Sequence, residues 1–137
     1  MWYIAPRLAK LHLEEALIPL LWVHVFRYTP LTLFAPGQVD PGLPDDIVAT
    51  IAYGDLVSGI LAFITILFLR FGLPGGLMVA WIFNGVGIAD IVLALVRGVG
   101  AELYQYELGF NWYILNYYVP FLMVSHGLMV YRLVKRQ

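Results

Sequence analysis

The chain has 137 residues, of which 61% are hydrophobic and 12% are charged, and its formal net charge is −1. A soluble domain carries about 25% charged residues, so this composition excludes an ordinary water-soluble globular protein. Because the chain has no cysteine and no excess of basic residues, disulfides, thiolate metal sites, iron–sulfur clusters and nucleic-acid binding are also excluded.

Four long apolar stretches fill most of the chain, at about residues 11–33, 47–69, 77–96 and 112–134. Each stretch holds about 20 or more residues, which is enough to cross roughly 30 Å of hydrocarbon as a helix. The sequence therefore predicts an all-α integral membrane protein. We expect one domain over residues 1–137, a bundle of four transmembrane helices joined mostly by short loops.

The first apolar stretch is the least typical, because Pro19, His24, Arg27 and Pro30 interrupt it. A secretory signal has basic residues before an unbroken apolar run, and this run instead follows acidic residues. We therefore expect the stretch to remain as the first transmembrane helix. His24 and Arg27 are three residues apart, which places them on one face of that helix.

The segment 35–46 is predicted to be the one long loop, on the outer side of the membrane, because it contains three prolines and two glycines. Asp45 and Asp46 close this loop where the second helix begins, and a helix N-terminus favours carboxylates. The second helix is expected to end near Arg70. The short turn 71–76 then makes the second and third helices antiparallel neighbours.

Small residues at a spacing of four predict how these two helices pack. The second helix has Gly54, Ser58 and Ala62, and the third has Gly85 and Ala89, with Gly87 between them. Small side chains allow helix backbones to approach closely in a membrane. We therefore expect close contact between the two helices along these faces.

The distribution of basic residues predicts the orientation of the chain. If the four helices alternate, one side of the membrane holds most of the basic residues, namely Arg7, Lys10, Arg70, Arg132, Lys135 and Arg136. The opposite side is acidic, with only Arg97 clearly basic. Basic residues favour the cytoplasmic side, so we expect a multi-pass protein of the plasma (inner) membrane with both termini in the cytoplasm.

Polar side chains lie inside the apolar stretches, where each unpaired charge costs at least about 2.5–3.5 kcal/mol. They are expected to turn inward and share one pocket in the outer half of the bundle. The candidate residues of this buried cluster are His24, Arg27, Asp55, Asn84, Asp90, Asn116, Tyr117 and His126.

Charge pairing predicts the centre of this cluster. Arg27 is expected to lie between Asp55 and Asp90, because pairing the opposite charges removes the cost of leaving each of them isolated in hydrocarbon. Asn116 is expected to supply a further hydrogen bond. A tyrosine hydroxyl is expected to complete the cluster, from Tyr53, Tyr113 or Tyr117.

The two histidines within the stretches, His24 and His126, suggest haem as an alternative. Counting along straight helices places them at depths that differ by up to about 10 Å, which disfavours a haem held by both. His126 is instead expected to bond Ser125, Asn84 or a backbone carbonyl. No resident cofactor and no metal site are predicted, because no pair of histidines has ligand spacing.

The cluster either fastens the helices together or binds a ligand, and the sequence leaves both open. Our leading hypothesis is a pocket for a small or amphipathic ligand or a lipid. The alternatives are a structural or accessory subunit of a larger membrane complex, a lipid-modifying membrane enzyme, and a channel or transporter formed by a homo-oligomer. No common enzyme motif occurs in the sequence, so no catalytic residue is assigned.

Overall fold

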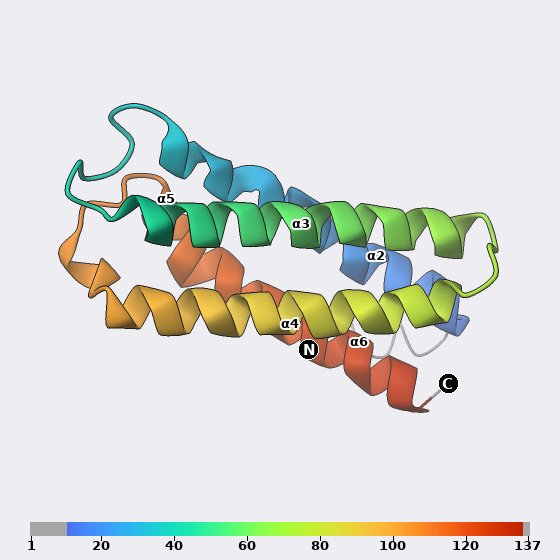
Figure 1. Ribbon diagram of the computed structural model, residues 1–137. Coiled ribbons are helices and arrows are strands. Elements are labelled where there is room, and N and C mark those ends of the chain that lie inside the picture. The colour runs from blue at the N-terminus through green and yellow to red at the C-terminus, as the bar shows by residue number, and fades with distance from the viewer. Residues whose placement is uncertain (1–10, 136–137) are drawn as a thin grey trace.

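The computed structural model describes residues 11–135, and Figure 1 shows them as a bundle of long helices. The elements in chain order are α2 (Leu13–Val25), η1 (Phe26–Phe34), α3 (Asp45–Arg70), α4 (Gly76–Gly100), η2 (Leu103–Gln105), α5 (Asn111–Tyr113), η3 (Ile114–Tyr118) and α6 (Val119–Lys135). No β-strand occurs between residues 11 and 135. Arg7, Lys10 and Arg136, which contributed to the predicted orientation, lie outside the described residues.

Four helical segments are long and apolar enough to cross a membrane, and we call them spans 1 to 4. They are Leu13–Phe34, Asp45–Arg70, Gly76–Gly100 and Asn111–Lys135. Each begins and ends within a few residues of the apolar stretch that predicted it. The prediction of an all-helical chain with four such segments is therefore confirmed.

Spans 1 and 4 each change their winding near a proline, Pro30 and Pro120, whereas the part of span 1 around Pro19 stays α-helical. Span 1 becomes a 3-10 helix from Phe26, and Pro30 inside it has no N–H for the carbonyl four residues earlier. Span 4 contains one π-helical stretch, η3, which ends two residues before Pro120. Proline at that position likewise cannot donate the regular helical hydrogen bond. Each irregular stretch changes the number of residues per turn, so the side chains on its two sides face other directions than they would along one regular α-helix.

The loop 35–44 folds back over one end of the bundle, which we call the loop end. The Asp40 N–H donates to the Glu107 carbonyl at 2.8 Å. Gly109 has a φ of +52°, and a Cβ atom there would lie 2.2 Å from the Gln38 carbonyl oxygen, so only glycine fits. The two loops are thus tied together. The opposite end, with the turn 71–75, is the turn end.

Spans 2 and 3 are antiparallel neighbours, as Figure 1 shows for α3 and α4. The small-residue face expected on α3 is buried at Ser58 and Ala62. Of the small residues expected on this face of α4, Gly85 and Ala89 are exposed, so that part of the prediction was wrong, whereas Gly87 is buried. The inward face of α4 instead passes through the buried Asn84 and Gly87 and the partly buried Asp90, at a spacing of three, because the two polar side chains gain more from turning inward than small residues do. The buried residues of α4 are Gly76, Ala80, Phe83, Asn84, Gly87, Ile91 and Gly98.

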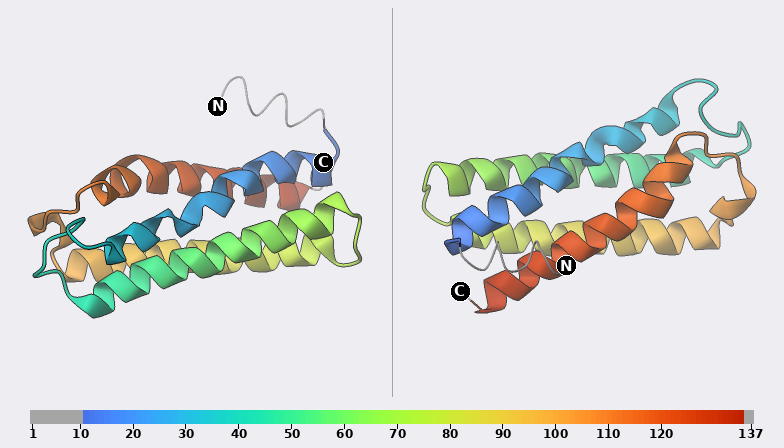
Figure 2. Two further views of the ribbon diagram at one scale, coloured as in Figure 1. Left: turned by 90° about the horizontal axis from the view of Figure 1, so that it is seen from above. Right: turned by 180° about the vertical axis from the view of Figure 1, so that it is seen from behind.

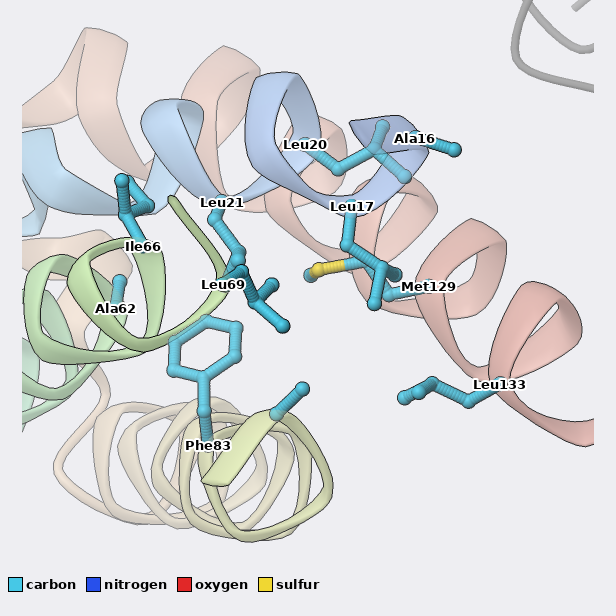
Figure 3. Packing of buried hydrophobic residues seen from close by; sticks show 11 residues of the cluster. Ala16, Leu17, Leu20, Leu21, Ala62, Ile66, Leu69, Phe83, Met129 and Leu133 are labelled. Carbon is cyan, nitrogen blue, oxygen red and sulfur yellow. The ribbon is translucent and has the colours of Figure 1, made fainter. Parts of the chain in front are cut away.

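Two apolar clusters fill the bundle, one at each end. Figure 3 shows the cluster at the turn end, where side chains of α2, α3, α4 and α6, such as Leu17 and Phe83, point toward one another. The cluster at the loop end includes Leu33, Val48 and Leu108. Along span 1 and α3, the buried ionisable residues His24, Arg27 and Asp55 lie between these clusters.

Candidate functional site: a buried ion cluster beside an apolar cavity

The centre of the site is the guanidinium of Arg27, whose side chain is 0% exposed. Its Nε donates to Asp55 Oδ1 at 2.6 Å, and its Nη2 donates to Asp90 Oδ2 at 2.5 Å. Its Nη1 donates to the Gly87 carbonyl at 3.3 Å. One side chain thus joins span 1, α3 and α4. Such a buried charge is tolerated only when its partners are this close and well oriented.

Two glycines make room for the cluster. A Cβ atom on Gly54 would lie 1.9 Å from Asp90 Oδ1, and one on Gly87 would lie 2.6 Å from His126 Cε1. Asp90 also accepts a hydrogen bond from the Ser58 hydroxyl at 3.3 Å. The small residues of α3 and α4 are therefore needed at the positions where ionisable side chains cross between the helices.

His126 extends the cluster toward the turn end. Its Nδ1 lies 3.0 Å from Asn84 Oδ1, one of the partners expected from the sequence, and Asn84 Nδ2 donates to the Ala80 carbonyl at 2.9 Å. Because an amide oxygen only accepts, Nδ1 carries the proton. The lone pair of Nε2 then faces Arg27 Nη1 at 3.5 Å.

His24 lies beside His126, with 4.2 Å between the ring centroids, and also contacts Phe83. The sequence predicted that these two histidines lie at different depths, whereas the structure places them side by side. The 3-10 winding of span 1 rises about 2.0 Å per residue instead of about 1.5 Å, which carries His24 deeper than a count along an α-helix gives. His24 is 0% exposed, and neither ring nitrogen has a hydrogen-bond partner within residues 11–135.

The histidine pair does not have the geometry of a bis-histidine haem. In such a site the iron and the porphyrin plane lie between the two imidazoles. The rings of His24 and His126 are in contact at 4.2 Å, so a porphyrin between them would require the helices to move apart.

Two predicted members of the cluster, Asn116 and Tyr117, lie outside it. Asn116 is exposed, and its Nδ2 donates to the Trp112 carbonyl at 2.8 Å. Tyr117 is 67% exposed and its ring stacks on that of Tyr113, which is also exposed, as is Tyr53. None of the three tyrosines that we considered supplies a hydroxyl to the cluster.

Sequence reasoning missed two polar residues near the site. The hydroxyl of Tyr118 donates to the Val23 carbonyl, and the buried Asn111 accepts from the Thr32 hydroxyl at 3.1 Å. Both lie in or next to the π-helical stretch, whose wide turn shifts the inward face by one residue. Pro120 inside an otherwise apolar stretch was the available signal for such a shift.

A cavity of about 190 Å³ lies between the ion cluster and the loop end. Apolar side chains from all four spans and from both loops form nearly all of its wall, while Arg27 and Asp55 form its floor. Asn111 also faces the cavity, and its Nδ2 has no hydrogen-bond partner among the described residues. An unpaired buried amide N–H costs about 1–3 kcal/mol, so this wall gains from an acceptor placed in the cavity.

Residues 1–134 match a family described as a domain of unknown function, DUF8737. The chain belongs to this family. No curated protein and no solved structure gives a significant match to this chain.

The chemistry available to this DUF8737 domain comes from carboxylates, imidazoles and amides. Within residues 11–135, no group of three or more histidines and acids has the arrangement of a metal site. Asp55 is the ionised acceptor on the cavity wall, and Asn111 is the free donor. An apolar cavity with a few oriented polar groups is the usual form of a small-molecule binding site.

Proposed function

We propose that this protein binds a small amphipathic molecule or a lipid within the membrane. The observation that carries the proposal is the apolar cavity of about 190 Å³ that ends on the Arg27–Asp55–Asp90 cluster. The apolar wall accommodates the apolar part of the ligand through close van der Waals packing, because a molecule that comes from lipid hydrocarbon gains little from hydrophobic burial. The polar groups at the cavity fix the orientation of the bound molecule.

The size of the cavity limits the ligand. An engineered cavity of about 150 Å³ in a soluble protein binds benzene, so this one accepts a body of similar or slightly larger size. A whole two-chain lipid does not fit. The part of the ligand inside the cavity is therefore a head group with a few carbons, or a small ring.

The membrane setting is part of the same proposal. We assign the chain to the plasma (inner) membrane as a multi-pass protein, with the loop end outside and both termini in the cytoplasm. The support is the excess of basic residues at the turn end and near the termini, together with the acidic loop end.

Occupancy of the cavity can be measured by native mass spectrometry of the protein released from lipid nanodiscs. Ile91→Phe places a larger side chain in the cavity wall, whereas Ile88→Phe makes the same change on an exposed position of the same helix. We expect a molecule of constant mass on the wild type and on I88F, and roughly tenfold lower occupancy on I91F. Equal occupancy of I91F and the wild type would contradict the proposal.

A further inference from the structure

The loops close the cavity at the loop end. The Asp40–Glu107 hydrogen bond and the close approach of Gly109 to Gln38 hold loops 35–44 and 106–110 against each other. Leu108 of the second loop is buried in the apolar cluster beneath them and also lines the cavity. A ligand therefore does not pass between these two loops without breaking these contacts.

The side between α3 and α4 is closed as well. The two helices pack against each other, and Arg97 Nη2 bonds Asp46 Oδ2 at 2.5 Å near the loop end. On the other side of α3, η1 packs closely against the helix. Cavity-lining residues from these elements, such as Leu33 and Val48, are buried.

The side between α4 and span 4 is different. Span 4 crosses α4 obliquely, as Figures 1 and 2 show. Its α6 part packs on α4, whereas its η3 part packs mainly on α5 and α6 of the same span. Cavity-lining residues on this side are partly exposed: Val99 is 71% exposed, and Ala94, Leu95, Leu115 and Val119 are half-buried. If the bundle spans a bilayer, this is the side on which the cavity would meet hydrocarbon.

The charges at the floor select the head group. One arginine and two aspartates give the ionised cluster a formal charge of −1. The Arg27 nitrogens are all directed at partners inside the cluster, whereas Asp55 Oδ2 takes part in none of the hydrogen bonds of residues 11–135. The floor therefore accepts a hydrogen bond or a positive charge and repels an anion.

We propose that the ligand is a single-chain amphiphile with an alcohol or amine head, which enters between α4 and span 4. Its head donates to Asp55, and its tail extends through the side opening into the bilayer. The small volume fits this arrangement because only the head and the first carbons need to lie inside. This inference rests on the proposed binding function and names its ligand class and entry route.

The head group is tested with dodecylamine, dodecanol and dodecanoic acid, which share one chain length. Each is added to the protein in nanodiscs, and bound ligand is measured by native mass spectrometry with the partition into empty nanodiscs subtracted. We expect the amine and the alcohol to bind the wild type at least about tenfold more tightly than the carboxylate. Dodecanoate binding as tightly as dodecylamine would overturn the head-group assignment.

Two variants locate this preference. Asp55→Asn turns the free acceptor at the floor into an amide N–H donor, and Asp90→Asn removes the same charge from a residue that does not line the cavity. We expect D55N to shift the ratio of carboxylate to amine binding by at least about tenfold toward the carboxylate, and D90N to shift it less. Equal shifts in the two variants would show that Asp55 does not contact the head.

The entry route is tested with Ala94→Trp, which fills the side opening, and Ala89→Trp, which makes the same change on an exposed residue outside the cavity. Val99→Trp is a second blocking variant near the loop end. We expect A94W and V99W to slow dodecylamine uptake at least about tenfold, and A89W to leave it unchanged. Unchanged uptake in both blocking variants overturns the side route, whereas no binding of any probe to the wild type overturns the binding function itself.

Discussion

The ion cluster shows how single atoms decide the packing of this bundle. Arg27 needs two carboxylates, and Asp90 and His126 need the space left by Gly54 and Gly87. A methyl group at either glycine would occupy a position already filled by an ionisable side chain. The stability of the bundle should therefore depend on these glycines more than on glycines at the surface.

We expect Gly87→Ala to destabilise the protein by about 1–3 kcal/mol, because the new Cβ would lie 2.6 Å from the His126 ring and 3.2 Å from Arg27 Nη1. Gly85→Ala is the matched control, since a Cβ there meets nothing within 4 Å. The control should be neutral or slightly stabilising, because alanine has a higher helix propensity than glycine. Thermal unfolding in mild detergent measures both variants, and equal melting temperatures would contradict the packing described here.

At the scale of residues, the sequence was sufficient to pair Arg27 with Asp55 and Asp90. The pairing follows from the cost of isolated charges in a membrane, which does not depend on the details of the helices. The contact between His24 and His126 could not be predicted in the same way. It depends on how far each helix rises per residue, and the 3-10 stretch of span 1 changes that rise.

At the scale of elements, the irregular winding of spans 1 and 4 brings the polar groups into register. The π-helical stretch turns Tyr118, and not Tyr117, toward span 1. A regular α-helix over residues 111–135 would present a different face to the cavity. The bounds of the four spans were predictable from hydropathy, but the face of span 4 was not, because hydropathy does not report the winding of a helix.

Pro120→Ala should restore regular α-helical hydrogen bonding and rotate the start of span 4 away from its present face. The Tyr118–Val23 hydrogen bond would then be lost. Tyr118→Phe in the wild-type background should cost about 0.5–1.5 kcal/mol, and the same change in P120A should cost much less. A double-mutant cycle of thermal stabilities measures this coupling, and equal costs in both backgrounds would show that Pro120 does not set the face.

At the scale of the whole molecule, the outer surface of the long helices carries many large apolar side chains. Large exposed side chains such as Phe63, Trp81 and Val92 cover α3 and α4, and they would be unfavourable in water. Span 2 is 26 residues long, about 39 Å at the helical rise, which exceeds the roughly 30 Å of a hydrocarbon core. A bilayer is the solvent that fits both the length and the surface of this bundle.

The orientation of the bundle can be measured directly because the chain has no cysteine. Gln38→Cys places one thiol on an exposed residue of the loop end, and Leu73→Cys places one on an exposed residue of the turn end. The basic residues predict that an impermeant maleimide labels Q38C on intact cells and labels L73C only after permeabilisation. The reverse pattern would place the loop end in the cytoplasm. The cavity would be unchanged, but the ligand that we propose would then enter from the cytoplasmic half of the bilayer, so this experiment decides which leaflet would supply it.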